Sequence, residues 1–467
     1  MPLVPLLVAA SLVSASGLAL ADLVPALRRN GLLRRLGWAW LLGCAWWGAS
    51  AFAASHVLHL PLRRGVLLPL ALLPIAAALA RRLTSAAPER PAKEPLRPFE
   101  GILLALLLAF GVFVTLSLLA HGLAIPVSDW DGKMTWVAQA RFIRGARSVD
   151  APALRDPAAW ITHPQYPVLM PVLQVAAQEI ADAPWEDDRF VRALYALFWP
   201  AFLLVLHDAA ARRAGRLAAS AAVLVAAMAP MFAFSQHGGA AGTYSDLPLA
   251  CFWGGGLLLL TVEGAGLAEG LAAGLLLGAA VLTKNEGLPL AAIALAAAGA
   301  GAFAGGRRRA ALPALLAAAG VAGASALVLV SWRSAIPPRY DEGQVESYAL
   351  AVLLHGVATR LPAAARASGR LMADRAEWGL TWIAVPLGLV LGARKLRRRE
   401  ALPLGIAILG ALCLYAAAYA LSGWPVDTLV FTTWDRLLVQ IALPLFALLA
   451  LTLDPRPDSP QRIAASS

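Results

Sequence analysis

Charged residues and cysteines are scarce in this chain of 467 residues. Charged side chains make up 14% of it, hydrophobic residues make up 60%, and there are 3 cysteines. Because a soluble globular chain carries about a quarter charged residues, this composition excludes an ordinary soluble domain. Cys44, Cys251 and Cys413 each lie within an apolar run, without the paired spacing of a disulfide framework or a thiolate metal site.

Familiar catalytic motifs are also missing. The chain has no Walker A motif, no HExxH zinc motif and no G-x-S-x-G nucleophile motif. It does not show a matched pair of halves with interrupted helices, which is typical of many transporters. These absences argue against a P-loop NTPase, a zincin protease and an α/β-hydrolase.

What the chain has instead is a succession of apolar runs long enough to cross the ~30 Å of hydrocarbon in a bilayer. The mean hydropathy is +0.68. We expect an all-α polytopic membrane protein with about 13 transmembrane helices by the ~20-residue criterion. The expected spans lie at about 2–21, 36–60, 65–80, 100–125, 189–206, 217–235, 246–262, 266–283, 287–306, 310–332, 377–393, 401–422 and 437–453.

The runs and their connections divide the chain into three parts. Residues 1–98 hold three additional N-terminal spans and a Pro- and Arg-rich linker. Residues 99–453 form the main membrane module, which is interrupted by polar connections at 126–188 and 333–376, where we expect short amphipathic helices. Residues 454–467 form a polar tail. The first run lacks a preceding basic segment, so we expect a retained span and not a cleaved signal peptide.

The net charge of +11 comes largely from arginines in short connections. This distribution favours membrane topology and contact with lipid headgroups over nucleic-acid binding. If the spans alternate, one set of connections holds most of the basic clusters, and the positive-inside rule makes that set cytoplasmic. We therefore expect a multi-pass protein of the bacterial inner membrane whose polar loops and active site face the periplasm.

One polar stretch, 126–171, stands out from the apolar sequence around it. Asp129 and Asp131 flank Trp130 near its beginning, and Lys133 follows. A carboxylate here is a candidate general base for an acceptor hydroxyl. The alternative for Asp129 is to cap a helix that begins near Gly132, because Asp is a favoured N-cap residue.

His163 and Tyr166 lie later in this stretch, in a segment interrupted by prolines. Each proline favours an extended conformation for the residue before it, so the segment is expected to hold both side chains on a rigid frame. The alternative interpretation is a structural turn that leads into the next helix.

Three later turns carry polar residues on the same predicted side. Tyr244 and Asp246 begin one span, where they either belong to a site or cap the helix. Lys284 and Glu286 interrupt an apolar stretch, and ionisable residues near membrane depth indicate function, although they also suit a tight turn in which they pair. Arg436 opens the last run and suits either bidentate phosphate contact or anchoring at the interface.

Together these motifs resemble the GT-C glycosyltransferases, integral-membrane enzymes, and in particular bacterial members related to family 39. The resemblance covers roughly residues 100–450, and the order and shared sidedness of the motifs support it more than any one motif. The motifs are Ser128-Asp129-Trp130-Asp131, His163-Pro164-x-Tyr166-Pro167-x-Leu169-x-Pro171, Tyr244-Ser245-Asp246-Leu247-Pro248, Thr283-Lys284-x-Glu286-Gly287, and Arg436 with Pro444.

The resemblance implies an inverting-type transfer of a sugar from a polyprenyl-phosphate carrier to a hydroxyl of an envelope glycan, lipid or protein. The acidic residue that serves as base in the first large loop is best matched by Asp131, with Asp129 as second choice. By position, Lys284 and Arg436 would hold the donor phosphate. Members of the family differ in their use of a divalent metal, so a metal cofactor is left open. Further candidate substrate-binding residues are Lys133, His163, Tyr166, Tyr244, Asp246 and Glu286.

Two other classes remain as alternatives. A flippase or transporter of a lipid-linked or amphipathic substrate would need polar groups through the depth of the membrane. A non-catalytic scaffold for envelope assembly would need none of the site residues. The concentration of ionisable residues on one predicted side favours the enzyme.

Overall fold

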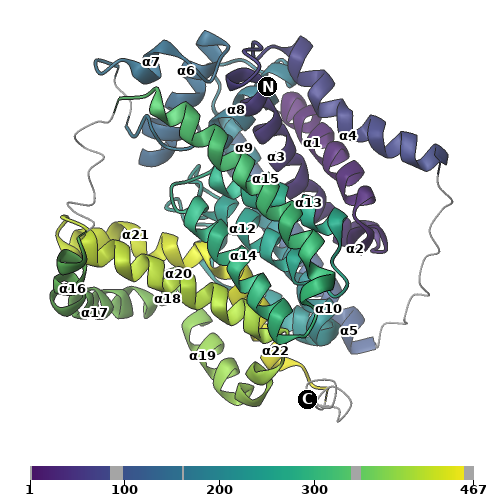
Figure 1. The fold of residues 1–467 in the computed structure, drawn as a ribbon, viewed down its shortest axis with the longest axis vertical. Coiled ribbons are helices and arrows are strands. Elements are labelled where there is room, and N and C mark those ends of the chain that lie inside the picture. Colours follow the sequence, from purple (N-terminus) through teal and green to yellow (C-terminus); the bar gives the residue numbers. More distant parts are fainter. Residues whose placement is uncertain (1–2, 85–97, 160–161, 338–348, 457–467) are drawn as a thin grey trace.

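A computed structural model describes residues 3–84, 98–159, 162–337 and 349–456. The regular secondary structure in these residues is entirely helical (Figure 1). The expectation of an all-α architecture is confirmed for this part of the chain. Most of the linker between residues 81 and 98, the middle of the 333–376 connection and most of the tail from 454 onwards lie outside the described residues.

The N-terminal residues form a group of close-packed helices. The small side chains of α1 and α3 let the two backbones approach closely, which is how helices pack within membranes. The helices of this first part are α1 (Leu3–Leu23), α2 (Pro25–Arg28), α3 (Leu32–His56), α4 (Arg64–Thr84) and α5 (Pro98–Ala124).

The 126–188 connection is itself folded and packs onto the bundle. It begins with a π-helical turn, η1 (Gly132–Val137), which continues into α6 (Ala138–Ala146) and is followed by the short α7 (Pro152–Arg155). Its last helix, α8 (Leu169–Ala181), is almost entirely buried and packs against α3. The connection is therefore partly core, because α8 carries an apolar sequence that the bundle covers.

The central helices surround α12, which is buried along its whole length. The backbone of α10 leaves helical geometry at Gly215 (φ +81°), so its two parts correspond to two of the predicted runs. The helices are α9 (Arg189–Ala196), α10 (Phe198–Ala227), α11 (Pro230–Ala233), α12 (Asp246–Leu260), α13 (Leu267–Val281), α14 (Gly287–Ala304) and α15 (Arg308–Ser334).

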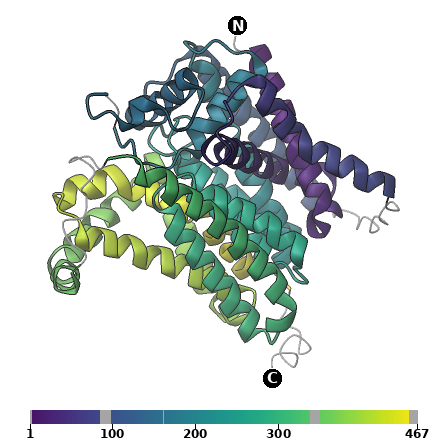
Figure 2. The same cartoon turned by 45° about the horizontal axis from the view of Figure 1, so that its top comes forward.

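The C-terminal helices lie along one side of this centre, with α16 and α17 at the edge beside α20 and α21 (Figures 1 and 2). The last predicted span is bent by 55° between α21 and α22. The helices are α16 (Leu350–Thr359), α17 (Leu361–Met372), α18 (Arg375–Trp378), α19 (Thr381–Leu391), η3 (Ala393–Arg397), α20 (Ala401–Leu421), α21 (Val426–Gln440) and α22 (Ala442–Leu453).

Among the described residues, 7 helices are long and apolar enough to cross a membrane, and the bent pair α21–α22 makes an eighth. Several predicted spans fall short because their helices are too short, as with the 15 residues of α12 and of α13. The outward surface supports a lipid environment. Along α5, for example, Phe99, Ile102, Leu106 and Phe113 are exposed, and such a row of exposed apolar side chains is typical of membrane contact. The protein is thus a polytopic helical membrane protein, and the count of about 13 spans stays a prediction.

Contacts between connections define two opposite sets. In one set, here called the loop face, Leu62 N–H bonds the carbonyl of Arg147 at 2.8 Å and Gln165 Nε2 bonds the carbonyl of Ile336 at 2.9 Å. These contacts join the connections after α3 and α15 to the folded 126–188 connection. Both contacts join connections that alternating spans would place in one set, and the assignment of the loops to sets stays a prediction.

The other set, here called the arginine face, joins the basic connections to one another. Arg212 Nη1 bonds the carbonyl of Ala26 at 2.8 Å, and Arg456 Nη2 bonds the carbonyl of Arg213 at 2.8 Å. Which side of the bilayer each face meets stays a prediction from the positive-inside rule.

The α1–α3 contact gives a test of the packing. A Cβ added at Gly17 would lie 1.7 Å from the carbonyl oxygen of Ala39, whereas one added at Gly111 of α5 meets nothing within 4 Å. We expect Gly17→Ala to destabilise the protein by about 1–3 kcal/mol. Gly111→Ala should be neutral or stabilising by up to about 1 kcal/mol, because Ala favours helix more than Gly does. Thermal unfolding of both variants in detergent measures this difference, and equal melting temperatures would contradict the close α1–α3 approach.

Candidate active site

Asp246 is the most deeply buried charge on the loop face. It is the first residue of α12, and its side chain is 0% exposed. Its carboxylate receives three hydrogen bonds: from Lys284 Nζ at 2.8 Å, from Gln440 Nε2 at 2.7 Å and from Arg436 Nε at 3.0 Å. An ionised carboxylate is tolerated in such a place only when donors surround it in this way.

Arg436 links this buried carboxylate to the surface of the site. While its Nε bonds Asp246, its Nη2 lies 2.8 Å from Oδ2 of Asp131, whose side chain is 26% exposed. The guanidinium also stacks over Tyr244, with 4.4 Å from its central carbon to the ring centroid. The planar, forked guanidinium makes these contacts in different directions at once, which an ammonium group cannot do.

Lys284 and Glu286 continue the network on the other side of Asp246. Lys284 Nζ lies 3.4 Å from Oε1 of Glu286 as well as 2.8 Å from Asp246, and its side chain is 4% exposed. Oε2 of Glu286 is buried and has no hydrogen-bond partner among the described residues. The pairing of Lys284 with Glu286 matches the tight-turn alternative, and the bond to Asp246 adds a partner that this alternative did not include.

Two tyrosines lie close to the network. Burial raises the pKa of Tyr244 to about 12, with Asp131 acting in the same direction and Arg436 opposing it. Burial also raises the pKa of Tyr166 well above its ordinary value, and the nearby charge of Glu286 adds to the effect. Both hydroxyls therefore remain protonated near neutral pH and serve as hydrogen-bond donors, not as bases.

The ring of His163 packs on Tyr166, which lies beside the network. Their rings stack with centroids 4.7 Å apart, and Trp136 packs on the far side of Tyr166 at 5.8 Å. The prediction of an extended conformation before Pro164 is wrong for His163, whose φ is +53°. A turn explains the difference, since the N–H of Tyr166 bonds the carbonyl of His163 at 2.9 Å.

Asp129 and Asp131 have different environments although one residue separates them. Oδ2 of Asp129 accepts bonds from the N–H of Gly132 at 3.1 Å, from the N–H of Thr243 at 3.2 Å and from the hydroxyl of Thr243 at 2.8 Å. Asp129 thus caps the turn at Gly132, as its structural alternative predicted, and ties this turn to the residues before α12. Burial raises the pKa of Asp129 above its ordinary value, although the bonds from Thr243 act in the opposite direction.

The structure therefore brings together most of the predicted residues, by different routes. Lys133 is exposed, and no hydrogen bond or ion pair of its side chain occurs among the described residues. His163 packs on Tyr166 from the side. The residues that form one continuous polar network are Asp131, Tyr244, Asp246, Lys284, Glu286 and Arg436.

Most of the residues between the spans expected at 401–422 and 437–453 form a helix. α21 begins at Val426, and Arg436 lies within it, followed one turn later by Gln440. The spacing of four residues places Arg436 and Gln440 on one helix face, from which both reach Asp246. Gln440 is a site residue that sequence reasoning missed, and its isolated amide within an apolar run is the signal that marks it.

Among the described residues, no three His, Cys, Asp or Glu side chains gather closely enough to hold a metal ion. The carboxylates of the network come closest to such a site, but both oxygens of Asp246 already accept hydrogen bonds from Lys284, Arg436 and Gln440. The residues present therefore do not form a resident metal site, and the contribution of a metal that arrives with a substrate stays open.

A second polar cluster on the loop face has the order Ser–His–Asp. His56 lies between Asp150, 3.1 Å from its Nδ1, and the hydroxyl of Ser331, 3.2 Å from its Nε2. Ser331 lies within α15, where the main-chain N–H groups are used by the helix itself. Without free N–H groups beside the hydroxyl there is no oxyanion hole, so this cluster links α3, α15 and the 126–188 connection structurally.

Comparison of the chain with protein-family models, with curated proteins and with solved structures gives no match.

The Asp129–Thr243 contact can be tested by a double-mutant cycle. Asp129→Ala removes the cap and should cost about 0.5–2 kcal/mol, and Thr243→Val removes its strongest donor. Because the two side chains are in direct contact, we expect a coupling energy of about 0.5–3 kcal/mol in thermal or chemical unfolding. Asp427→Ala, at an exposed carboxylate of α21, is the matched control and should change stability little. Additive effects of the first two substitutions would contradict the Asp129–Thr243 contact.

Proposed function

We propose that this protein is a glycosyltransferase of the GT-C type that moves a sugar from a polyprenyl-phosphate carrier to a hydroxyl of an envelope glycan, lipid or protein. The enzyme is proposed to cross the bacterial inner membrane about 13 times, with its site on the periplasmic side, where a lipid-linked donor replaces the nucleotide sugars of the cytoplasm. The donor and the type of reaction are those that the resemblance to GT-C enzymes implies, and the residues of this chain supply the chemical groups.

The observation that carries the proposal is the network itself. Four stretches that are far apart in sequence, at 131, 244–246, 284–286 and 436, meet on the loop face in one chain of ion pairs. The network is buried in its middle, at Asp246 and Lys284, and is partly exposed at its two ends, Asp131 and Glu286. Ionisable groups are costly within a membrane protein, and such a concentration on one side is expected of a site and not of a scaffold.

The buried and the accessible residues of the network have different roles in this proposal. Lys284 is enclosed between Asp246 and Glu286, so its charge is already neutralised. It therefore balances and positions the buried carboxylates, and direct contact with the donor phosphate falls to Arg436. Asp246 fixes the guanidinium through Nε and leaves the remaining nitrogens directed towards the accessible end.

The charges of the network determine how a donor phosphate reaches Arg436. The network holds three carboxylates (Asp131, Asp246 and Glu286) and two cations (Lys284 and Arg436). An incoming phosphate therefore has to take the place of a carboxylate at Arg436, and Asp131 is the exchangeable one because it is partly exposed and at the end of the chain. The exchange releases the Asp131 carboxylate from Arg436, so that it can accept a hydrogen bond from the acceptor hydroxyl.

Asp131 and Arg436 supply the groups that the proposed transfer needs. The acceptor oxygen attacks the anomeric carbon of the donor, its proton passes to the Asp131 carboxylate, and the bond from the anomeric carbon to the phosphate oxygen breaks with inversion. The electron pair remains on the polyprenyl phosphate, where Arg436 stabilises the added charge. Around the sugar, the unpartnered Oε2 of Glu286 accepts from a sugar hydroxyl, and the hydroxyls of Tyr166 and Tyr244 donate.

The role of Asp131 predicts opposite effects on transfer and on donor binding. Asp131→Asn should reduce transfer about 10²–10⁴-fold, the usual contribution of a general base. The same substitution should tighten donor binding roughly two- to fivefold, because the competing partner of Arg436 loses its charge and a partly exposed ion pair is worth up to about 1 kcal/mol. Purified protein incubated with defined polyprenyl-phosphate hexoses and pentoses tests both effects, by release of polyprenyl phosphate and by direct binding.

Asp427→Asn serves as the matched control, since it removes an exposed carboxylate of α21 outside the network. Full transfer by Asp131→Asn with Asp129 intact would overturn the assignment of the base. Failure of the unmodified protein to release polyprenyl phosphate from every donor, together with movement of the same lipids across a proteoliposome membrane, would favour the flippase alternative.

Arg436 and Lys284 should respond differently to loss of charge. Arg436→Gln is expected to weaken donor binding about 10–100-fold, the loss of a charge-assisted contact. Lys284→Met leaves the buried Asp246 short of a cation and should cost roughly 3–5 kcal/mol of stability. Adding Asp246→Asn to Lys284→Met removes the unpaired charge and should restore much of that stability. If Lys284→Met instead lowers donor affinity without lowering the melting temperature, Lys284 contacts the donor phosphate directly.

A further inference from the structure

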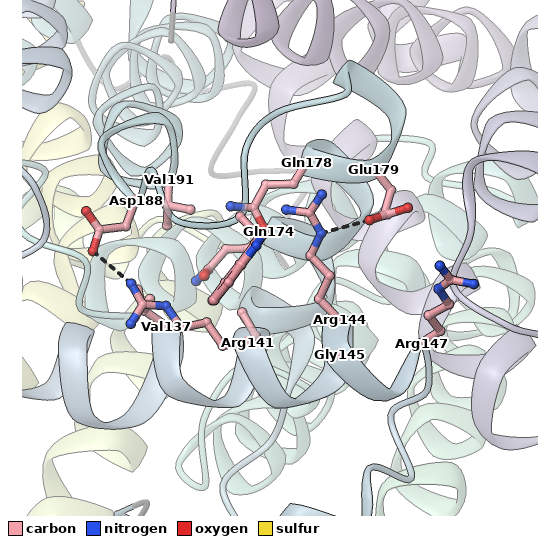
Figure 3. Close-up of a pocket in the computed structure, with 12 residues that line it drawn as sticks. Val137, Arg141, Arg144, Gly145, Arg147, Gln174, Gln178, Glu179, Asp188 and Val191 are labelled. Carbon is pink, nitrogen blue, oxygen red and sulfur yellow. Dashed lines mark hydrogen bonds and ion pairs between the residues drawn. The ribbon is translucent and has the colours of Figure 1, made fainter. Parts of the chain in front are cut away.

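A separate pocket of about 420 Å³ lies between the helical run η1–α6, which follows Asp131, and the helices α8 and α9 (Figure 3). This volume falls within the roughly 300–1,000 Å³ typical of small-molecule sites. None of the residues that line it belongs to the network described above. They come from η1, α6, α8, α9 and the connection before α9, and include Arg141, Arg144, Arg147, Gln174, Gln178 and Trp185.

The wall formed by α6 is rich in arginine. Arg144 Nε bonds Glu179 at 2.8 Å, and Arg141 lies 3.6 Å from Asp188 (Figure 3). Arg147, at the end of α6, is exposed and has no ion pair within the described part of the chain. Three cations therefore face two carboxylates, and the pocket has an excess of positive charge.

Two buried polar atoms in the wall have no partner among the described residues. They are Nη1 of Arg144, a donor, and Oε1 of Gln174, an acceptor. Gln174 is 1% exposed, and its amide nitrogen bonds the hydroxyl of Tyr195 at 3.2 Å, which fixes the side chain in place. Buried polar groups usually find partners, so a free donor and a free acceptor beside one pocket indicate a ligand that supplies both.

An aromatic surface completes the site. Trp185 lines the pocket and is 56% exposed, a large exposure for a tryptophan beside arginines and glutamines. The C–H groups on one face of a sugar ring pack favourably on an indole ring, while the ring hydroxyls need neighbouring donors and acceptors. Gln174 and Gln178 are suited to those hydroxyls, and the arginines are suited to an acidic group.

We propose that this pocket binds an acidic sugar, a monosaccharide unit that carries a carboxylate or a phosphate. The free acceptor of Gln174 and the exposed Trp185 distinguish it from a simple anion site, which needs only donors. Val137, which lines the pocket, follows Asp131 by six residues on one helical run, less than two turns away. The assignment of this sugar to the acceptor rests on the proposed function, whereas the binding site does not depend on it.

Binding can be measured on the purified full-length protein without any donor. The probes are glucuronic acid and glucose 6-phosphate, with glucose and inorganic phosphate as partial ligands, and the readout is saturation transfer to the sugar ring protons together with calorimetric affinity. We expect both acidic sugars to bind at least tenfold more tightly than glucose. Arg147→Ala and Trp185→Ala should each weaken them at least fivefold. Both residues are exposed, so these substitutions leave the core packing in place.

The control variants are Arg366→Ala and Trp424→Ala, which change an exposed arginine and an exposed tryptophan outside the pocket and should leave binding unchanged. Equal binding by the pocket variants and the controls would overturn the proposal. Inorganic phosphate that displaces glucose 6-phosphate at equal concentration, with no effect of Trp185→Ala, would overturn the sugar site in favour of a simple anion site.

A lipid headgroup offers an anionic group to the same arginines, so nanodiscs with and without phosphatidylglycerol separate the two sources. Loss of acidic-sugar binding only in nanodiscs that contain phosphatidylglycerol would overturn the assignment to a sugar. Because Asp131→Asn lies outside the pocket, it should bind the acidic sugars as the unmodified protein does. Failure of the transfer reaction is thereby distinguished from failure of this site.

Discussion

The burial of Asp246 is the constraint on which the loop face depends. Taking an ionised carboxylate out of water costs several kcal/mol, and it is tolerated only with good geometry and several donors. Here the donors come from three places: the turn before α14 supplies Lys284, and successive turns of α21 supply Arg436 and Gln440. Satisfying one carboxylate therefore fixes the position of α21 against α12. The 55° bend between α21 and α22 follows directly after Gln440, because Pro444 has no N–H to donate to the Gln440 carbonyl, which accepts from Trp253 instead.

The same constraint separates structural residues from residues free to react. Asp246, Lys284 and Gln440 are enclosed, and a change in any of them leaves an unsatisfied buried group. Arg436 belongs to both regions, with one nitrogen in the buried network and another at its accessible end. The pair Asp129 and Asp131 shows the division most clearly. The first is held by the main chain and by Thr243, whereas the second has one exchangeable partner.

Most of the fold was predictable because membrane helices are recognisable in a sequence as long apolar runs. Pairing of Lys284 with Glu286 and capping by Asp129 were predictable too, because both depend on neighbours in sequence. The errors arose where burial depends on partners far away. α21 reads as a polar connection because its Asp, Thr and Arg residues are judged one by one, although the same helix carries buried apolar residues, Leu429, Val430 and Leu437 among them, and packs against α12 and α17. Gln440 and the pocket arginines were missed for the same reason: their spacing of three or four residues is visible, but the surfaces they meet are not.

The charge count of the network also fixes an order of events for the proposed transfer. Before a donor arrives, Asp131 is paired with Arg436. Only a phosphate that occupies the guanidinium releases the carboxylate, so the base becomes active when the leaving group is already in place. An acceptor that binds first, in the pocket behind η1 and α6, would meet a base that is not yet free. In the proposed transfer the donor would therefore control the moment of reaction, while an acceptor held in the pocket would lie beside Val137, six residues after Asp131.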